Sequence, residues 1–294
     1  MKLVPSAIAL TLLVSIAGAE SPPSPRPLEI GVTLHPYFSW TANVVRDCDV
    51  RVIPILPGEV DAGDYQPRTE DIVKIGGLDA MVVNGVGHDD FIFDMIKASG
   101  NDKLRIIRPN DGVPLLKAVN GGTVNSHTFI SFSNAIQQTY AIARALSALR
   151  PDLASRFDQN AADYARRLRA IKAKAAQQLV DARVNRVVTV HDGYGYLMQE
   201  FGIDVAGVVE PAHGLIPSAK ELGAVVDLLK REHIQVVFSE ESFPAPLLKV
   251  LRDEGHARVY VISHIASGAY TADKFEKEMQ RNVDTMIRAL VTEA

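Results

Sequence analysis

Short apolar runs alternate with longer amphipathic segments along most of this chain. Runs rich in β-branched residues predict strands, and the segments with helical spacing between them predict helices. In the first part of the chain we expect strands over 28–33, 50–56, 80–84 and 104–107, and helices over 37–45, 69–75 and from about residue 90. Strands that alternate with helices in this way predict a parallel sheet with helices on both faces.

The middle of the chain is helical in pattern. Residues 134–148 have helical spacing, and residues 152–182 form a charged, Ala-rich segment without Gly or Pro. At about 1.5 Å per residue the second segment would extend about 45 Å, which is longer than a small domain is wide. We expect it to link two lobes, and an ordinary crossover helix within one larger sheet is the alternative.

The strand–helix alternation resumes after the long helix. Strands are expected over 186–190, 205–209, 236–239 and 259–262, and helices over 194–201, 218–232, 244–254 and 272–290. The predicted fold class is therefore α/β, with two lobes that each hold a mainly parallel sheet flanked by helices and are joined by one long helix. The expected divisions are 20–150 for the N-terminal lobe, 151–184 for the linking helix and 185–294 for the C-terminal lobe.

The first residues indicate export. Lys2 precedes a mostly apolar run over 3–16, and Ala17-Gly18-Ala19 has the form of a cleavage site. The apolar run is shorter than the ~20 residues that a membrane span needs. We therefore expect residues 1–19 to be a signal peptide that is cleaved to leave a periplasmic protein. An N-terminal membrane anchor is the alternative.

Composition narrows the possible functions. The 294 residues are 47% hydrophobic and 22% charged, as in ordinary globular proteins, and the formal net charge is −4. This charge and an aromatic content of 6% give no reason to expect a nucleic-acid partner. Cys48 is the only cysteine, so an intramolecular disulfide and a cysteine-based zinc site are both excluded. Any metal ion must be held by imidazoles and carboxylates.

The histidines are concentrated at the ends of expected elements. Of eight, five follow an expected strand or precede an expected helix, namely His35, His88, His127, His191 and His264. Ligands of open parallel sheets bind beyond the carboxyl ends of the strands, so these side chains can converge on one cleft. A single histidine at a strand end is more often structural, but five together favour a metal site. Imidazoles with one or two carboxylates suit zinc, and oxygen-rich sites favour manganese.

Other chemistry has weaker support. Ser239 and the pair His191-Asp192 supply residue types used in nucleophilic catalysis, but there is no G-x-S-x-G elbow and no H-E-x-x-H metalloprotease motif. Gly85-Val86-Gly87 follows an expected strand as in dinucleotide-binding folds, but Asp90 stands where the third glycine would be. These patterns do not predict an enzyme.

Several short stretches in this order resemble the metal-binding substrate-binding proteins of ABC uptake systems, the cluster that includes zinc- and manganese-binding members. The stretches are Tyr65-Gln66-Pro67, Val82 to Gly87, His127 to Ser131, Asn160 to Tyr164, Val190 to Tyr194, Phe201-Gly202-Ile203, Glu210 to Ser218 and Met279 to Asn282. They cover nearly all of the expected mature chain. The resemblance implies two α/β lobes, a rigid linking helix and one metal ion held between the lobes.

The resemblance also implies a ligand set. His127 matches the second ligand of the family, His191 matches the third, and Ser263-His264 occupies the place of the fourth, which is usually an Asp. The first ligand is usually a His in a D-P-H-x-Y-x-P stretch, where this chain has Gly63. We expect the missing bond to come from one of the neighbouring donors, which are His35, His88, Glu59, Asp61 and Asp64. A three-coordinate site completed by water or a small chelator, and a lost site, are the alternatives.

These inferences combine into one functional hypothesis. We expect a monomeric, non-enzymatic solute-binding protein that captures zinc, with manganese as the alternative, and delivers it to an ABC permease of the inner membrane. Glu240, Glu241 and Asp192 are the candidates for orienting the imidazoles, and the long helix predicts modest lobe movement on release. The alternatives are a secreted zinc-dependent hydrolase that uses a coordination position left open by Gly63, and a carrier of a chelated metal.

Overall fold

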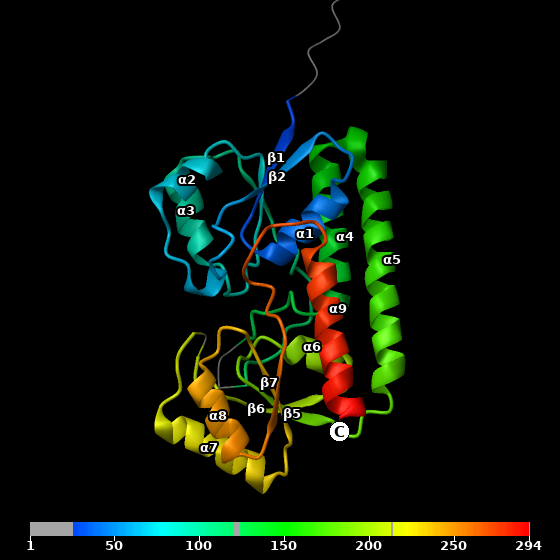
Figure 1. Ribbon diagram of the computed structural model, residues 1–294. Coiled ribbons are helices and arrows are strands. Elements are labelled where there is room, and N and C mark those ends of the chain that lie inside the picture. The colour runs from blue at the N-terminus through cyan, green and yellow to red at the C-terminus, as the bar shows by residue number, and fades with distance from the viewer. Residues whose placement is uncertain (1–25, 120–123, 213, 294) are drawn as a thin grey trace, which may run out of the picture.

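Two separate four-stranded parallel sheets form the centres of two lobes (Figure 1). The computed structural model describes residues 26–119, 124–212 and 214–293. The first sheet has the order β2-β1-β3-β4, with β1 (Leu28–Val32), β2 (Val50–Pro54), β3 (Ala80–Val82) and β4 (Arg105–Ile107). The second has the order β6-β5-β7-β8, with β5 (Arg186–Thr189), β6 (Asp204–Val208), β7 (Val236–Ser239) and β8 (Arg258–Val261). The predicted α/β fold of two lobes is confirmed, and a single larger sheet is excluded.

Helices lie between the strands, close to where the sequence predicts them. The first lobe contains α1 (His35–Val44), the short 3₁₀ helix η1 (Ala62–Asp64), α2 (Thr69–Ile75) and α3 (Phe91–Ser99). The helices α4 (Phe132–Leu149) and α5 (Ala154–Leu179) follow. The second half contains α6 (Gly195–Glu200), α7 (Ala219–Arg231), α8 (Ala245–Asp253), α9 (Lys274–Ile287) and a final π-helical turn (Arg288–Thr292).

The long helix α5 runs beside both lobes (Figure 1). Its 26 residues span about 39 Å at about 1.5 Å per residue. The helix begins two residues later than expected, because Pro151–Leu153 forms a separate 3₁₀ turn. It packs along α4 and contacts α1 and α9. These contacts hold α5 in a helical layer along its length.

The core is divided by the second sheet. Val187, Val236 and Phe238 belong to a large cluster that continues through the first lobe and the helical layer. Val188 and Val237 belong to a smaller cluster with residues of α7 and α8. Successive side chains of a strand point to opposite faces of its sheet, so the second sheet has an apolar cluster on each face.

The last helix returns to the first lobe. Ser39 Oγ donates to the Thr271 carbonyl at 2.8 Å, and Asn43 Nδ2 donates to the Ala272 carbonyl at 2.7 Å. Trp40 and Phe275 pack edge to face, with ring centroids 5.2 Å apart. The stretch 185–294, expected to be the second lobe, therefore ends in a helix that packs on α1 and α5.

The expected signal peptide, residues 1–19, lies outside the described residues. In the part of the chain that the structure describes, no helix has both the length and the apolar character needed to cross a bilayer.

Candidate metal centre

Four histidines from both lobes meet at the carboxyl ends of the two sheets. His88 follows β3 of the first sheet, whereas His191 follows β5 and His264 follows β8 of the second. His127 lies just before α4. All four side chains are buried, with 3–6% of the residue surface exposed. The structure therefore brings together four of the five histidines that the sequence placed at strand ends or before a helix.

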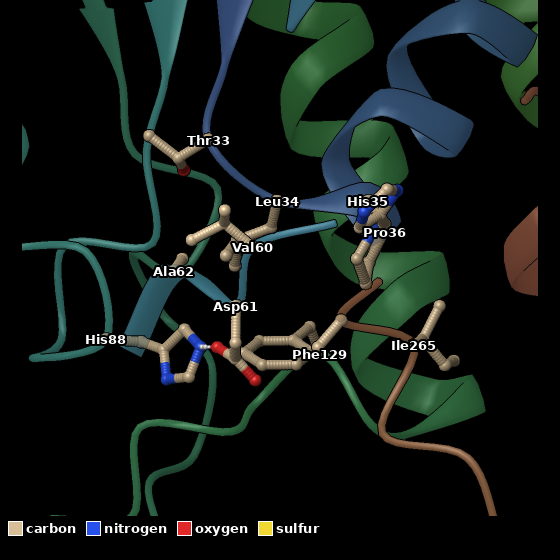
Figure 2. Close-up of a pocket in the computed structure, with 11 residues that line it drawn as sticks. Thr33, Leu34, His35, Pro36, Val60, Asp61, Ala62, His88, Phe129 and Ile265 are labelled. Atoms are coloured by element: carbon tan, nitrogen blue, oxygen red, sulfur yellow. Dashed lines mark ion pairs between the residues drawn. The ribbon is translucent and has the colours of Figure 1, made fainter. Parts of the chain in front are cut away.

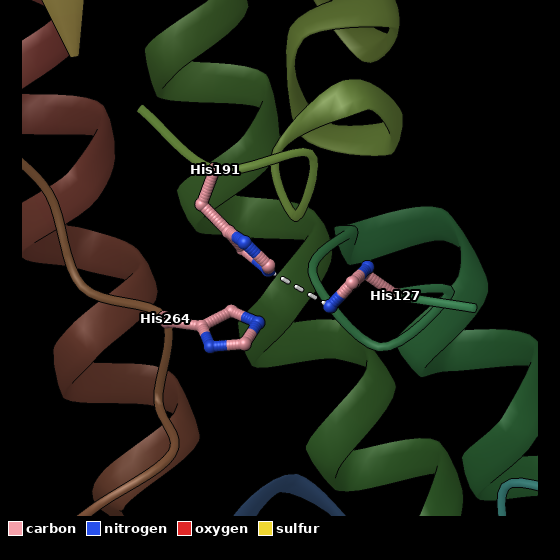
Figure 3. Close-up of side chains that lie close together, drawn as sticks. All are labelled: His127, His191 and His264. Atoms are coloured by element: carbon pink, nitrogen blue, oxygen red, sulfur yellow. Dashed lines mark hydrogen bonds between the residues drawn. The ribbon is translucent and has the colours of Figure 1, made fainter. Parts of the chain in front are cut away.

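Three of the four form a tight group (Figure 3). Potential ligand atoms of His127, His191 and His264, one from each, all lie within 4.8 Å of one another. The Nε2 atoms of His127 and His191 are 3.0 Å apart. His88 borders the group, with its ring centroid 4.8 Å from that of His127 and 6.0 Å from that of His264.

Each ring of the group has an oxygen acceptor beside its Nδ1 atom. His127 Nδ1 lies 3.1 Å from Asn125 Oδ1, and His191 Nδ1 lies 2.9 Å from Glu210 Oε2. His264 Nδ1 lies 3.2 Å from Asp61 Oδ2. A neutral ring that donates its Nδ1 hydrogen to such an acceptor keeps the lone pair on Nε2. Metal-bound histidines commonly have this arrangement. The polar surroundings thus suit three imidazoles that offer Nε2 to a cation.

Asp61 connects two of the histidines. Its Oδ2 accepts from His264 Nδ1, and its Oδ1 lies 3.5 Å from His88 Nε2 (Figure 2). Burial alone would raise the pKa of Asp61, but the hydrogen bonds and charges of His264 and His88 hold this pKa below its usual range. Burial lowers the pKa of His264, but Asp61, Glu240 and Glu210 outweigh that effect and raise it to about 8. The site therefore stabilises positive charge.

A buried carboxylate shapes the loop that carries His88. Asp89 accepts from Thr33 Oγ1 at 2.6 Å. It also accepts from the backbone N–H groups of Asn84 at 2.8 Å and Gly85 at 3.0 Å. Gly85 and Gly87 both have positive φ, which other residues rarely adopt. Together these features fold the chain tightly after β3 and position His88 beside His127.

A glycine allows two of the rings to approach the backbone. A Cβ atom on Gly193 would lie 2.7 Å from His191 Cδ2 and 3.1 Å from both Cδ2 and Nε2 of His264. Gly193 does not have positive φ. Space around the imidazoles, and not backbone conformation, is therefore what a side chain at this position would disturb.

A wide cleft leads from the group to solvent. Its wall includes His191 and His264 together with carboxylates from several elements, namely Glu59, Asp61, Glu210, Glu240, Glu241, Glu278 and Asp284. Lys274 and Arg281 also line it. The acidic residues outnumber the basic ones, so the opening attracts cations.

The other expected donors are placed differently. His35 Nε2 donates to the Gly58 carbonyl at 3.0 Å, and its ring stacks on Tyr270 with centroids 3.8 Å apart. Burial lowers the pKa of His35 to about 4. Within the part of the chain that the structure describes, the ring of His35 stacks on Tyr270 and on none of the four histidines, so the structure does not bring this residue into the group. For Asp64 only the backbone position, in η1, is described.

Two of the carboxylates expected to orient the imidazoles, Glu240 and Asp192, hydrogen-bond to neighbours of the rings. Glu240 accepts from Tyr194 Oη at 2.9 Å, and Tyr194 packs near His264 with centroids 6.2 Å apart. Asp192 Oδ1 accepts from Asn125 Nδ2 at 3.2 Å. Sequence reasoning did not identify Asn125 or Glu210 as ring partners. Glu210 begins one of the stretches that carry the family resemblance, and Asn125 lies two residues before another, but nothing in the sequence indicates which ring each one faces.

Comparison with known proteins points to metal-binding proteins. A family model described as ZnuA, zinc-uptake complex component A, periplasmic, matches residues 30–289. A putative metal-binding protein of Treponema pallidum is 24% identical over 254 residues, which cover 82% of this chain and 80% of that protein. The zinc-binding protein AdcA of Streptococcus pyogenes is also 24% identical, over 87% of this chain, and the chain spans about half, 53%, of AdcA.

A solved structure has higher identity. The solute-binding protein FpvC of Pseudomonas aeruginosa, in complex with Mn²⁺, is 44% identical, with a TM-score of 0.85 over 91% of this chain and 99% of that one. A second FpvC structure contains Ni²⁺ and matches equally well. A solved structure of ZnuA, at 22% identity and a TM-score of 0.78, shares the fold.

Proposed function

The chain belongs to the ZnuA family of metal-binding solute-binding proteins, and on that premise we propose that it captures a divalent transition-metal ion between its lobes and delivers it to an ABC permease. The family consists of transport proteins, so the hydrolase alternative is set aside. The observation that carries the proposal is the buried group of His127, His191 and His264, whose ligand atoms lie within 4.8 Å of one another.

We assign the metal bonds to the Nε2 atoms of these three histidines. Their Nδ1 atoms face Asn125 and the carboxylates of Glu210 and Asp61, as described above. Two nitrogens bound to one ion at about 2.1 Å lie about 3.0 Å apart at a right angle and about 3.4 Å apart at the tetrahedral angle. The Nε2 separation of 3.0 Å between His127 and His191 is compatible with a shared ion.

His88 is our choice for the donor that replaces the missing first histidine. It comes from the first lobe, as the replaced residue would, and its ring contacts those of His127 and His264. Asp61 is better suited to orienting rings, because its Oδ2 accepts from His264 and its Oδ1 accepts from the Gly63 amide at 2.8 Å. With His88 the set contains four imidazoles. His191 and His264 follow strands β5 and β8 of the second sheet, and His88 and His127 lie earlier in the chain, before α4.

Zinc is the proposed cargo, with manganese as the alternative. Imidazole-rich sites bind zinc more tightly than manganese, since affinity for nitrogen ligands rises along the first transition row. The relatives named above include zinc-binding proteins and a protein solved with Mn²⁺ and Ni²⁺, which supports a divalent transition metal without selecting one. A periplasmic location, export by a signal peptide and a monomeric state are parts of the same proposal.

Competitive metal titration tests the proposal. Metal-depleted protein should bind one zinc ion per chain, more tightly than manganese, and His191→Ala should lose this binding. His256→Asn is a matched control, because His256 is exposed and has a positive φ of 54° that asparagine tolerates. Equal zinc affinity in wild type and His191→Ala would refute the assigned site, and turnover of a generic ester by the zinc-loaded protein would refute the carrier role.

A further inference from the structure

We propose that Asn125 and Asp192 act as a relay across the cleft that orients His127 and fixes which of its ring nitrogens faces the metal. Asp192 follows β5 in the second lobe, next to His191, whereas Asn125 lies on the long connection from β4 to α4. The effect of this relay on metal affinity rests on the proposed function, but the relay itself is a property of the metal-free protein.

The orientation of the Asn125 amide is determined by its neighbours. Its Nδ2 atom faces two acceptors of Asp192, the main-chain carbonyl and Oδ1. Its Oδ1 faces the backbone N–H of His127 at 2.9 Å, which can only donate. Rotating the amide by half a turn would put oxygen against oxygen and N–H against N–H. Asn125 can therefore make all of these bonds in one orientation only.

The amide orientation in turn determines the tautomer of His127. Because the Asn125 Oδ1 atom 3.1 Å from His127 Nδ1 is an acceptor, Nδ1 must carry the hydrogen. A neutral imidazole then has its lone pair on Nε2. That atom lies 3.0 Å from His191 Nε2. The relay thus directs the metal-binding lone pair of His127 toward the histidine next to Asp192.

Further bonds attach the same connection to the second lobe. Asp192 Oδ2 accepts from the Val119 amide at 3.0 Å. Tyr196 Oη donates to the Asn125 carbonyl at 2.8 Å and accepts from the Leu116 amide at 3.0 Å. Leu116 and Val119, which precede Asn125, and Asn125 itself are thereby tied to the short segment that begins with His191. His127 is consequently held in register with His191, although 64 residues separate them.

The first experiment measures the ring nitrogens of His127 in metal-free protein by ¹⁵N NMR, at an alkaline pH where imidazoles are neutral. Wild type should show a hydrogen on Nδ1 of His127, because that atom faces the Asn125 Oδ1 acceptor. Asn125→Ala should show a mixture of the two tautomers at His127 while the tautomer of His191, which faces Glu210, stays unchanged. Asn160→Ala is the control, because this buried asparagine donates to Val44 and Arg46 far from the histidines.

The second experiment measures zinc affinity of the same variants. Loss of a group that orients a metal-bound histidine typically weakens binding about 10- to 100-fold, and we expect this loss in Asn125→Ala. Asp192→Ala should lose less, because the main-chain carbonyl still accepts from Asn125. Asp192→Asn should lose less than Asp192→Ala, because its amide oxygen can still accept from Asn125, although its amide nitrogen cannot accept from Val119.

The two readouts separate failure of the relay from failure of the proposed function. An unchanged His127 tautomer in folded Asn125→Ala overturns the relay, and so does zinc affinity equal to that of wild type. A wild-type protein that shows the expected tautomer and binds no metal would uphold the relay and overturn the metal-carrier proposal.

Discussion

Gly193→Ala tests how closely the site depends on backbone next to the imidazoles. The added Cβ would lie 2.7 Å from His191 Cδ2. Carbon atoms in contact lie about 3.5 Å apart, so the His191 ring would have to move by about 0.8 Å. Metal–ligand distances tolerate only about 0.2 Å. His264, with two atoms 3.1 Å from the same position, would also have to give way.

The expected result is a loss of zinc affinity with little loss of folding. Displacing one histidine from its optimal position should weaken binding about 10- to 100-fold, comparable with removing an orienting partner, which corresponds to about 1.4–2.7 kcal/mol. The assay is competition with a chelator of known affinity, with circular dichroism to confirm that the variant is folded. Folding should be preserved because Gly193 has no positive φ to lose.

Gly223→Ala is the matched control. Gly223 lies inside α7, and a Cβ atom there would meet nothing within 4 Å. Replacing an interior helical glycine by alanine should stabilise the fold by about 0.5–1 kcal/mol and leave zinc affinity unchanged. A folded Gly193→Ala variant that binds zinc as tightly as Gly223→Ala would refute the assignment of His191 and His264 as ligands.

Three further changes test separate parts of the structure. His88→Ala should weaken zinc binding by more than the roughly 100-fold expected for an orienting residue, measured by the same competition, and a smaller loss would exclude His88 as a ligand. His35→Phe should flatten the pH dependence of unfolding in metal-free protein. The His35 pKa of about 4 lies below its unfolded value of 6.5. The contribution of neutral His35 to the free energy of unfolding is therefore complete above pH 6.5 and is lost as pH falls toward 4, by up to about 3 kcal/mol. If the free energy of unfolding, measured by denaturant titration at several pH values, changed with pH equally in variant and wild type, this account would be contradicted. Glu200→Ala should destabilise the fold by about 1–2 kcal/mol, because Glu200 accepts from the Phe132 and Ser133 amides at the start of α4, and an unchanged melting temperature would show that this cap is dispensable.

The fold could be predicted because its sequence signals are local. The β-branched run Val236–Ser239 and the amphipathic run Thr69–Ile75 form the expected strand and helix with the expected ends. The long helix was recognisable because no Gly or Pro interrupts residues 152–182. The return of α9 to the first lobe could not be predicted, because it depends on contacts such as Trp40 with Phe275, which are distant in sequence.

The site was predictable only in part, for a physical reason. The rule that ligands gather at the carboxyl ends of parallel strands selects a sheet edge, and His35 and His88 both satisfy it. Which ring turns toward the cleft depends on packing: Tyr270 stacks on His35 and keeps it near Gly58, 23 residues along the chain. Likewise, the role of Asn125 follows from a contact with Asp192 across 67 residues, which no local pattern reveals.

The most direct test of the metal centre is anomalous diffraction at the zinc absorption edge from crystals of the zinc-loaded protein. Our account predicts one strong peak per chain, about 2.1 Å from the Nε2 atoms of His127, His191 and His264, with His88 completing the coordination. A peak elsewhere in the chain, or an ion bound without these three imidazoles, would contradict it.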